Sequence, residues 1–221
     1  MLYLDMENIL VAGANGTTGK KIVNLLKESQ YFNPIAMVRK EEQKAFFEAK
    51  KIDTVLGDLE GDVSQVFNIT NKIDKVLFAA GSGGKKVVEV DQEGAKHLID
   101  ASNKNNVKKF VMLSSMGADQ PEKAEQLQEY LKAKHNADEY LKSSGLTYSI
   151  VRPGALTNNE LTNEIELEEK LNKSGEISRN DVAQTLVRTL NDEIANNATF
   201  EIIKGNTLIG DALNKVSTVK A

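Results

Sequence analysis

The sequence of 221 residues contains no cysteine and only three prolines, and aromatic residues make up 5% of it. The absence of cysteine excludes disulfides, thiolate metal sites and cysteine nucleophiles. No apolar run approaches the roughly 20 residues that span a bilayer, and residues 1–7 lack the basic start and long apolar stretch of a signal peptide. A basic excess is missing too, because the formal net charge is −4, which disfavours nucleic-acid binding. We therefore expect a cytoplasmic protein whose partners include neither nucleic acid nor a membrane.

The composition is that of an ordinary globular protein, with 40% hydrophobic and 27% charged residues. The length suits one α/β domain with room for a small appendage. No repeat, low-complexity tract or linker divides the chain. We predict a single domain over residues 1–221, present as a monomer or a homodimer.

Three glycines near the start of the chain lie between a predicted strand, residues 9–12, and a predicted helix. Gly13 permits a sharp turn, Gly16 lets the backbone approach a pyrophosphate, and Gly19 lets the helix pack closely on the sheet. The helix N-terminus offers free N–H groups and a positive dipole end to phosphates. This arrangement predicts a dinucleotide site, which also includes the intervening residues Asn15, Thr17 and Thr18.

Further apolar runs alternate with helical patterns along most of the chain. Strands are predicted at residues 34–39, 52–56, 74–80, 107–113, 147–151 and 199–203, with two short strands, 165–167 and 176–178, flanking a turn at 172–175. The longest predicted helix covers 121–142, another begins near 91, one closes the chain at 209–216, and Asp62 and Asp181 are expected helix caps. This alternation predicts a parallel sheet covered by helices on both faces, with ligands bound at the carboxyl ends of the strands.

The end of the second predicted strand bears on the choice of coenzyme. NAD sites usually place an acidic residue there against the ribose 2′-hydroxyl, whereas an arginine suits a 2′-phosphate. This chain has Arg39 and Lys40, and no acid before Glu41. A guanidinium can contact a phosphate through two hydrogen bonds. We expect NADP rather than NAD; the alternative is that both residues are solvated at the start of a helix.

Six segments together resemble the atypical short-chain dehydrogenase/reductases, in their NmrA-like and sugar-epimerase-like branch. They are the glycine motif at 11–19, Gly57-Asp58-Leu59, the run 78–81, Leu113-Ser114-Ser115, the run 150–154 and the run 178–183. The resemblance covers nearly the whole chain. It implies a Rossmann-type doubly wound α/β fold with a small C-terminal substrate cap, mainly within 155–180 and 205–221.

The resemblance also implies roles for particular positions. Asp58 and Leu59 would flank the adenine, while Ala79, Ala80 and Gly81 would line the path between the two riboses. The catalytic serine, tyrosine and lysine of the family would match Ser114, Tyr130 and Lys134, and Asp91 would replace the usual active-site asparagine. Pro153 lies at a turn that either borders the nicotinamide pocket or is only structural.

Tyr130 and Lys134 are one helical turn apart and on the same face. Tyrosine is a poor general base at neutral pH, but a nearby ammonium stabilises its phenolate form. The pair could pass a proton to or from a substrate oxygen while hydride moves at the nicotinamide, with Ser114 or Ser115 hydrogen-bonded to that oxygen. The alternative is a surface tyrosine beside a solvated lysine. His97, His135 and the acidic residues at 164–169 form no metal-ligand pattern, so no metal site is expected.

Two functions from different classes remain. The first is an NADP-dependent oxidoreductase or epimerase-like enzyme. The short stretch after Gly154 leaves a small substrate cap, which favours a compact carbonyl, quinone or flavin-like substrate over a nucleotide sugar. The second is a non-catalytic NADP-binding sensor or regulator, as some NmrA-like relatives are. Replacing Tyr130 by phenylalanine would distinguish the two.

Overall fold

The computed structural model of the protein describes residues 6–69 and 72–217. Residues 1–5, 70–71 and 218–221 lie outside the described part. These undescribed residues include most of the segment 1–7, which was considered as a signal peptide, and the last residues of the predicted domain and of its cap.

The described part forms a nine-stranded sheet in the order β11-β8-β10-β6-β5-β4-β1-β2-β3. The strands from β10 through β6, β5, β4, β1 and β2 to β3 pair in parallel with their neighbours. At the β10 side, β8 pairs antiparallel with β10, and β11 pairs antiparallel with β8. The strands are β1 (Glu7–Ala12), β2 (Phe32–Val38), β3 (Asp53–Leu56), β4 (Lys75–Phe78), β5 (Lys109–Leu113), β6 (Tyr148–Pro153), β8 (Glu164–Glu168), β10 (Ala198–Lys204) and β11 (Thr207–Leu208). The predicted doubly wound parallel sheet is confirmed, and its order reverses between β1 and β4, where such sheets bind ligands.

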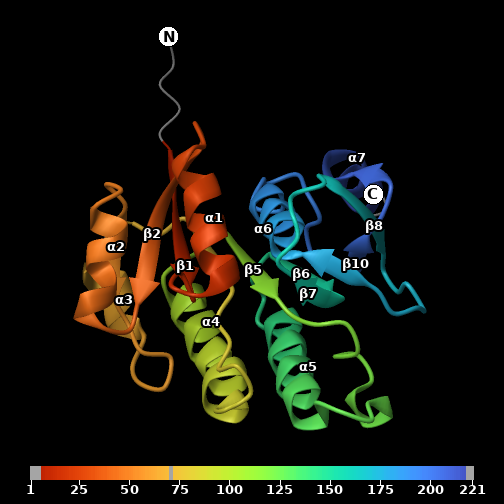
Figure 1. Ribbon diagram of the computed structural model, residues 1–221. Helices are drawn as coiled ribbons and strands as arrows, with labels where there is room; N and C mark the ends of the chain where they lie inside the picture. The colour runs from red at the N-terminus through yellow and green to blue at the C-terminus, as the bar shows by residue number, and fades with distance from the viewer. Residues whose placement is uncertain (1–5, 70–71, 218–221) are drawn as a thin grey trace.

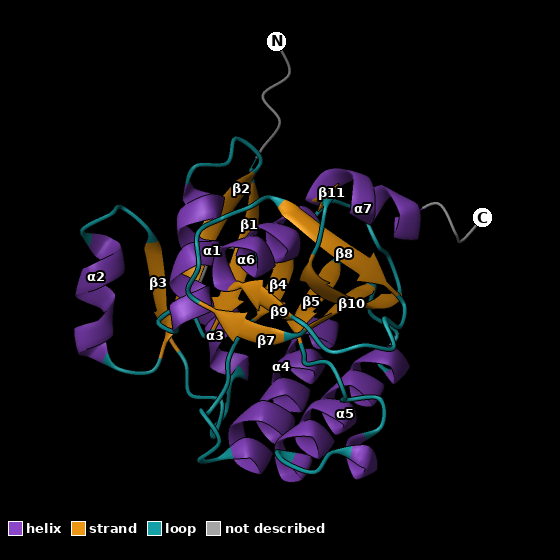
Figure 2. Cartoon of the chain, turned by 45° about the vertical axis from the view of Figure 1, so that its right-hand side comes forward, coloured by secondary structure: helices purple, strands orange, loops and turns teal. Residues whose placement is uncertain are grey.

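Helices cover both faces of this sheet (Figure 1; Figure 2). The helices are α1 (Thr17–Lys27), α2 (Lys44–Glu48), α3 (Ser64–Ile69), α4 (Gly94–Lys104), α5 (Gln128–Ser143), α6 (Arg179–Arg188) and α7 (Ile209–Ser217). Ile9 and Val11 of β1 pack in one core with α1 and α6, whereas Leu10 and Ala12 pack in a second core with α4 and α5. Successive side chains of a strand point to opposite faces of the sheet, so alternate residues of one buried apolar strand pack into the two different cores.

Three predicted helix boundaries are wrong. The predicted helix 121–142 is a single turn, η3 (Pro121–Lys123), followed by a break and then α5. The helix predicted to begin near Asp91 starts earlier, with the π-helical segment η2 (Val87–Glu93) that leads into α4. Ser178 rather than Asp181 caps α6, because its Oγ accepts the backbone N–H of Asp181. The expected local bond at Asp62 is present, to the N–H of Ser64.

The two short strands expected around the turn at 172–175 are present, but they do not pair with each other. β8 joins the main sheet beside β10, while β9 (Glu176–Ser178) pairs in parallel with β7 (Ala155–Thr157) in a separate two-stranded sheet. β7 follows β6 directly, so this small sheet lies next to the carboxyl end of β6.

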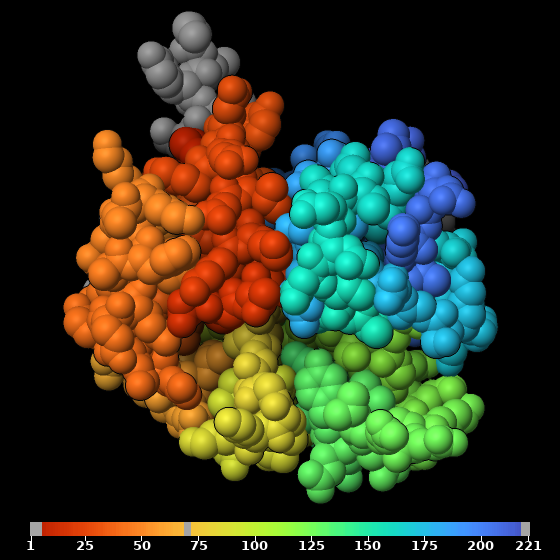
Figure 3. Space-filling model, in the orientation of Figure 1, coloured from red at the N-terminus to blue at the C-terminus, as the bar shows by residue number. Residues whose placement is uncertain are grey.

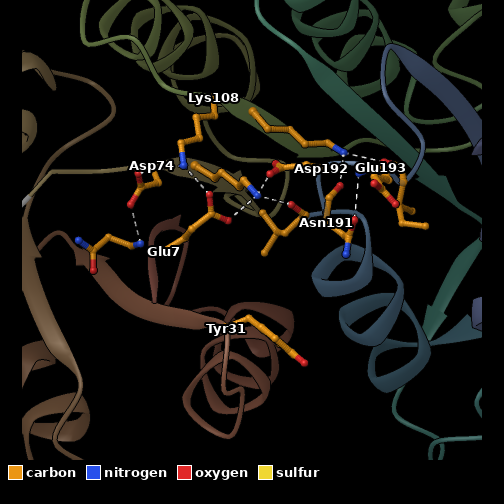
Figure 4. A network of polar contacts seen from close by, with 12 residues as sticks. Glu7, Tyr31, Asp74, Lys108, Asn191, Asp192 and Glu193 are labelled. Atoms are coloured by element: carbon orange, nitrogen blue, oxygen red, sulfur yellow. Dashed lines mark hydrogen bonds and ion pairs between the residues drawn. The ribbon is translucent and has the colours of Figure 1, made fainter. Parts of the chain in front are cut away.

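Two lysines are buried at the amino ends of the central strands β4 and β5, opposite the carboxyl ends. Lys75 and Lys109 are each only 1% exposed. The Lys75 ammonium forms ion pairs with Glu7 and Asp192, at 2.6 Å each, and donates a hydrogen bond to the Leu190 carbonyl. Lys109 donates to three oxygens, the carbonyls of residues 191 and 194 and the side chain of Asn196. This network (Figure 4) connects the turn after α6 to the sheet. The C-terminal end of a helix carries a partial negative charge, which favours cations at this place.

Burial and the neighbouring charge of Lys75 lower the pKa of Lys109 from 10.5 to about 7. Between these values the unfolded chain binds more protons than the folded one, so this group makes the free energy of unfolding rise with pH. The slope is at most about 1.4 kcal/mol per pH unit. Urea unfolding over this pH range should show a smaller slope for Lys109→Met than for the unchanged protein.

The neighbouring Lys108 is a matched control. Its ammonium binds Glu7, which raises its pKa above 10.5, so Lys108→Met should leave the slope between pH 7 and 10.5 unchanged. Equal slopes for Lys109→Met and the unchanged protein would contradict the assignment.

Candidate functional site

A cavity of about 880 Å³ lies at the carboxyl edge of the parallel strands. Figure 3 shows the front surface hollowed where the red N-terminal segments meet the yellow, green and cyan ones. Most of the predicted site residues line this cavity: Gly13, Asn15, Gly16, Thr17, Thr18, Arg39, Asp58, Leu59, Ala79, Ala80, Gly81, Asp91, Ser114, Tyr130 and Lys134. Residues from five separate strand ends are therefore brought to one place.

Gly19, Lys40 and Pro153 do not line the cavity. A Cβ on Gly19 would overlap the backbone of Gly13, so this glycine serves the close packing of α1. Lys40 lies near Glu42, at 3.6 Å. Pro153 is buried at the end of β6, and its carbonyl accepts the N–H of Met116.

The glycine loop has the shape that a pyrophosphate requires. Gly13 has φ +85°, and a Cβ there would lie 2.5 Å from the backbone nitrogen of Ala80. Around Gly16, by contrast, only the Gly13 carbonyl among the described atoms would lie within 4 Å of an added Cβ. The N-terminus of α1 has no side-chain cap, so its N–H groups are available to an anion. The loop fits a dinucleotide.

Two cations lie in the wall of the same cavity, Arg39 at the end of β2 and Lys86 just before η2. Arg39 and Lys86 both contact Glu60, at 3.6 and 2.6 Å. The side chain of Arg39 is 54% exposed, and Gln43 holds the backbone N–H groups of Arg39 and Lys40. The longer of the two ion pairs is that of Arg39, which leaves its guanidinium able to turn toward a ligand.

Tyr130 and Lys134 lie in the cavity as the helical spacing predicts. Lys134 is buried, its Nζ donates to the carbonyl of Leu113 at 3.3 Å, and it lies 3.5 Å from Asp91 Oδ1. The same Nζ is 5.7 Å from the centre of the Tyr130 ring. Asp91 is held in turn by the N–H of Ser82. A buried ammonium is thus fixed next to a tyrosine.

Ser114 is tied to two buried residues that the sequence did not suggest. Its Oγ donates to Asp138 Oδ2 at 2.8 Å. The same oxygen accepts a hydrogen bond from Arg152 Nε at 2.9 Å and forms an ion pair with Nη2 at 2.8 Å. Because Oδ2 already accepts the Nε hydrogen bond and is ion-paired with the guanidinium, the proton shared with Ser114 belongs to the serine. Burial raises the pKa of the Asp138 carboxyl, while Arg152 and Ser114 oppose the rise. Ser114 therefore offers acceptor lone pairs to the cavity.

The cavity also contains residues that sequence reasoning missed, among them Leu127, Leu156 and Arg179. Leu127 precedes α5, is 69% exposed and has φ +61°, which is rare for a bulky residue and often marks a functional site. No local pattern indicated Leu127. Arg179 lies in the run 178–183, which had contributed to the family resemblance without a role.

The two histidines have no role in this cavity. His135 Nδ1 lies 2.8 Å from the carbonyl of Ala118, and His97 is exposed. Among residues 6–69 and 72–217, no group of three or more histidine, aspartate or glutamate side chains could hold a metal ion. No helix in this part of the chain is long and apolar enough to cross a bilayer.

A family model described as NAD(P)H-binding matches residues 13–193. The chain belongs to this NAD(P)H-binding family. YhfK of Bacillus subtilis, named an uncharacterized sugar epimerase, is 39% identical over 213 residues, which cover 94% of this chain and 99% of YhfK. A solved structure from Bacillus halodurans, assigned as an NAD-dependent epimerase/dehydratase, has 35% identity and a TM-score of 0.89, and the match covers 95% and 99% of the two chains. The oxidoreductase YlbE of Lactococcus lactis has 30% identity and a TM-score of 0.84, with 95% and 96% covered.

Membership of the NAD(P)H-binding family confirms the predicted resemblance, the Rossmann-type fold and an NAD(P) coenzyme. It also confirms the expected class, that of NAD(P)-dependent oxidoreductases and epimerases.

Proposed function

We propose that this protein is an NADP-dependent oxidoreductase acting on a small carbonyl, quinone or flavin-like substrate. The observation that supports it is that one cavity is lined both by the glycine loop and by Tyr130 with Lys134. Ligand cavities typically measure about 300–1,000 Å³, so one of about 880 Å³ that also holds a dinucleotide favours a compact second ligand over a nucleotide sugar. One relative, YlbE, is named an oxidoreductase.

In this proposal the chain contributes positioning and a proton. A bound nicotinamide coenzyme supplies or accepts the hydride. The Tyr130 hydroxyl donates a proton in the reducing direction, to the oxygen of a carbonyl or quinone or to a ring nitrogen of a flavin. Lys134, held by Asp91 and the Leu113 carbonyl, stabilises the phenolate left behind. Ser114 accepts a hydrogen bond from the newly formed O–H or N–H group of the reduced product.

The test is NADPH oxidation by the purified protein with an aldehyde, a quinone and FMN as acceptors. We expect at least one of these classes to be reduced in a reaction that saturates with both ligands. Binding of NADPH without reduction of any acceptor would favour the alternative, a non-catalytic NADP-binding sensor.

We propose that the Arg39 guanidinium binds the 2′-phosphate of NADP. Arg39→Ala should weaken NADPH binding about tenfold or more, the usual loss for a charge-assisted hydrogen bond, and leave NADH binding unchanged. Isothermal titration with each coenzyme measures both values.

Lys40→Ala is the matched control, because Lys40 is adjacent but does not line the cavity. It should leave both affinities unchanged. An equal loss for NADPH and NADH in Arg39→Ala, or no loss, would contradict the preference for NADP.

A further inference from the structure

Arg179 is a cation in the cavity wall that the proposed chemistry does not use. It is the first residue of α6 and is partly buried. Its Nη1 donates to the carbonyl of Leu156 at 3.1 Å and to Asn158 Oδ1 at 3.0 Å. Both acceptors are neutral; Leu156 lies in β7 and Asn158 directly follows it. The guanidinium is therefore held in place without an acidic group to neutralise its charge.

The remaining donors of Arg179 have no partner among the described residues. Within the described part of the chain, neither Nε nor Nη2 makes a hydrogen bond, and no carboxylate pairs with the guanidinium. The acid of the same helix turn, Asp181, is occupied elsewhere, because it accepts bonds from Ser178 and from the N–H groups of Thr162 and Asn163. A guanidinium has donors in a planar fork that matches a carboxylate or phosphate.

The other cations of the cavity differ from Arg179 either in having an acidic partner or in being exposed. Arg39 and Lys86 share Glu60, and Lys134 lies by Asp91. Lys85 is exposed in the segment after the glycines at 83 and 84. Arg179 is thus a partly buried cavity cation with no acidic partner in the described residues.

We propose that Arg179 binds an anionic oxygen group, a carboxylate or phosphate, inside the cavity. The expected source is the substrate, since the glycine loop and the N-terminus of α1 already offer N–H groups to the coenzyme phosphates; this part rests on the proposed function. An acceptor that carries an anionic group would then be preferred over a neutral one with the same ring system. The second source is the coenzyme pyrophosphate, which presents the same chemistry.

FMN and riboflavin test the substrate source, because they share their ring and differ by one phosphate. Arg179→Gln, Arg179→Lys and the control Arg188→Gln, at the far end of the same helix, are titrated with NADP, NAD, FMN and riboflavin. We expect the unchanged protein to bind FMN more tightly than riboflavin, and Arg179→Gln to lose about tenfold or more of that preference with NADP affinity unchanged. Arg179→Lys should retain part of it, and thermal unfolding of each variant shows whether the fold is intact.

A loss of NADP and NAD affinity by the same factor in Arg179→Gln would also support an anion site and would assign it to the coenzyme. Identical behaviour of Arg179→Gln and Arg188→Gln with all four ligands would overturn the inference, including the case in which neither flavin binds. A different result would contradict the proposed function without contradicting the Arg179 site. If the unchanged protein bound no dinucleotide, that function would be lost, while an Arg179-dependent preference for FMN would still stand.

Discussion

Replacement of Tyr130 by phenylalanine is expected to lower kcat by about a hundredfold or more, the usual contribution of a positioned general acid. The change removes only the hydroxyl, and the ring can remain near Lys134, whose Nζ is 5.7 Å from its centre. Coenzyme affinity should not change, because the glycine loop and the end of β2 are untouched. Steady-state NADPH oxidation together with isothermal titration separates the two quantities.

Tyr140→Phe is the matched control on the same helix. Tyr140 bonds Asp100 and does not line the cavity, so kcat should be unaffected. If Tyr130→Phe turned over as fast as the unchanged enzyme, Tyr130 would not be the proton donor, and the protein would reduce its substrate by proximity to the coenzyme alone. A sensor would show no turnover in either form.

The second large effect concerns stability. Asp138→Ala leaves the guanidinium of Arg152, a residue only 5% exposed, without its carboxylate. Breaking a buried ion pair from one side typically costs about 3–5 kcal/mol, because a buried charge is left uncompensated. Urea unfolding should show a loss of this size in the free energy of unfolding. Ser114 would also lose the acceptor that orients its hydroxyl.

The double replacement Asp138→Leu with Arg152→Met tests the cause. A buried pair can often be exchanged for apolar residues at little cost, so the double variant should be more stable than Asp138→Ala. A loss below about 1 kcal/mol in Asp138→Ala, within the range of an exposed pair, would show that the pair is not effectively buried.

The parts of the fold and cavity that could be predicted from the sequence are those with local causes. The glycine loop depends on residues 13, 16 and 19, and the structure shows φ +85° at Gly13 and tight packing at Gly19. Apolar runs located the parallel strands because both faces of each strand are buried. Tyr130 and Lys134 share a helix face through their spacing alone.

The parts that could not be predicted depend on contacts between distant segments. Asp138 and Arg152 meet because α5 packs beside β6, and nothing in either segment indicates the pairing. The break before α5 needs Leu127 at positive φ, which no propensity favours in leucine. Lys75 and Lys109 lie in predicted strands, and the turn after α6 buries both of these charged side chains.

Isothermal titration of the purified protein with NADP and, separately, with NAD tests the central claim most directly. That claim is that the cavity between the glycine loop and α5 is a dinucleotide site. We predict that both coenzymes bind and that NADP binds more tightly. Binding of neither coenzyme would contradict the claim and would remove the oxidoreductase and the sensor interpretations together.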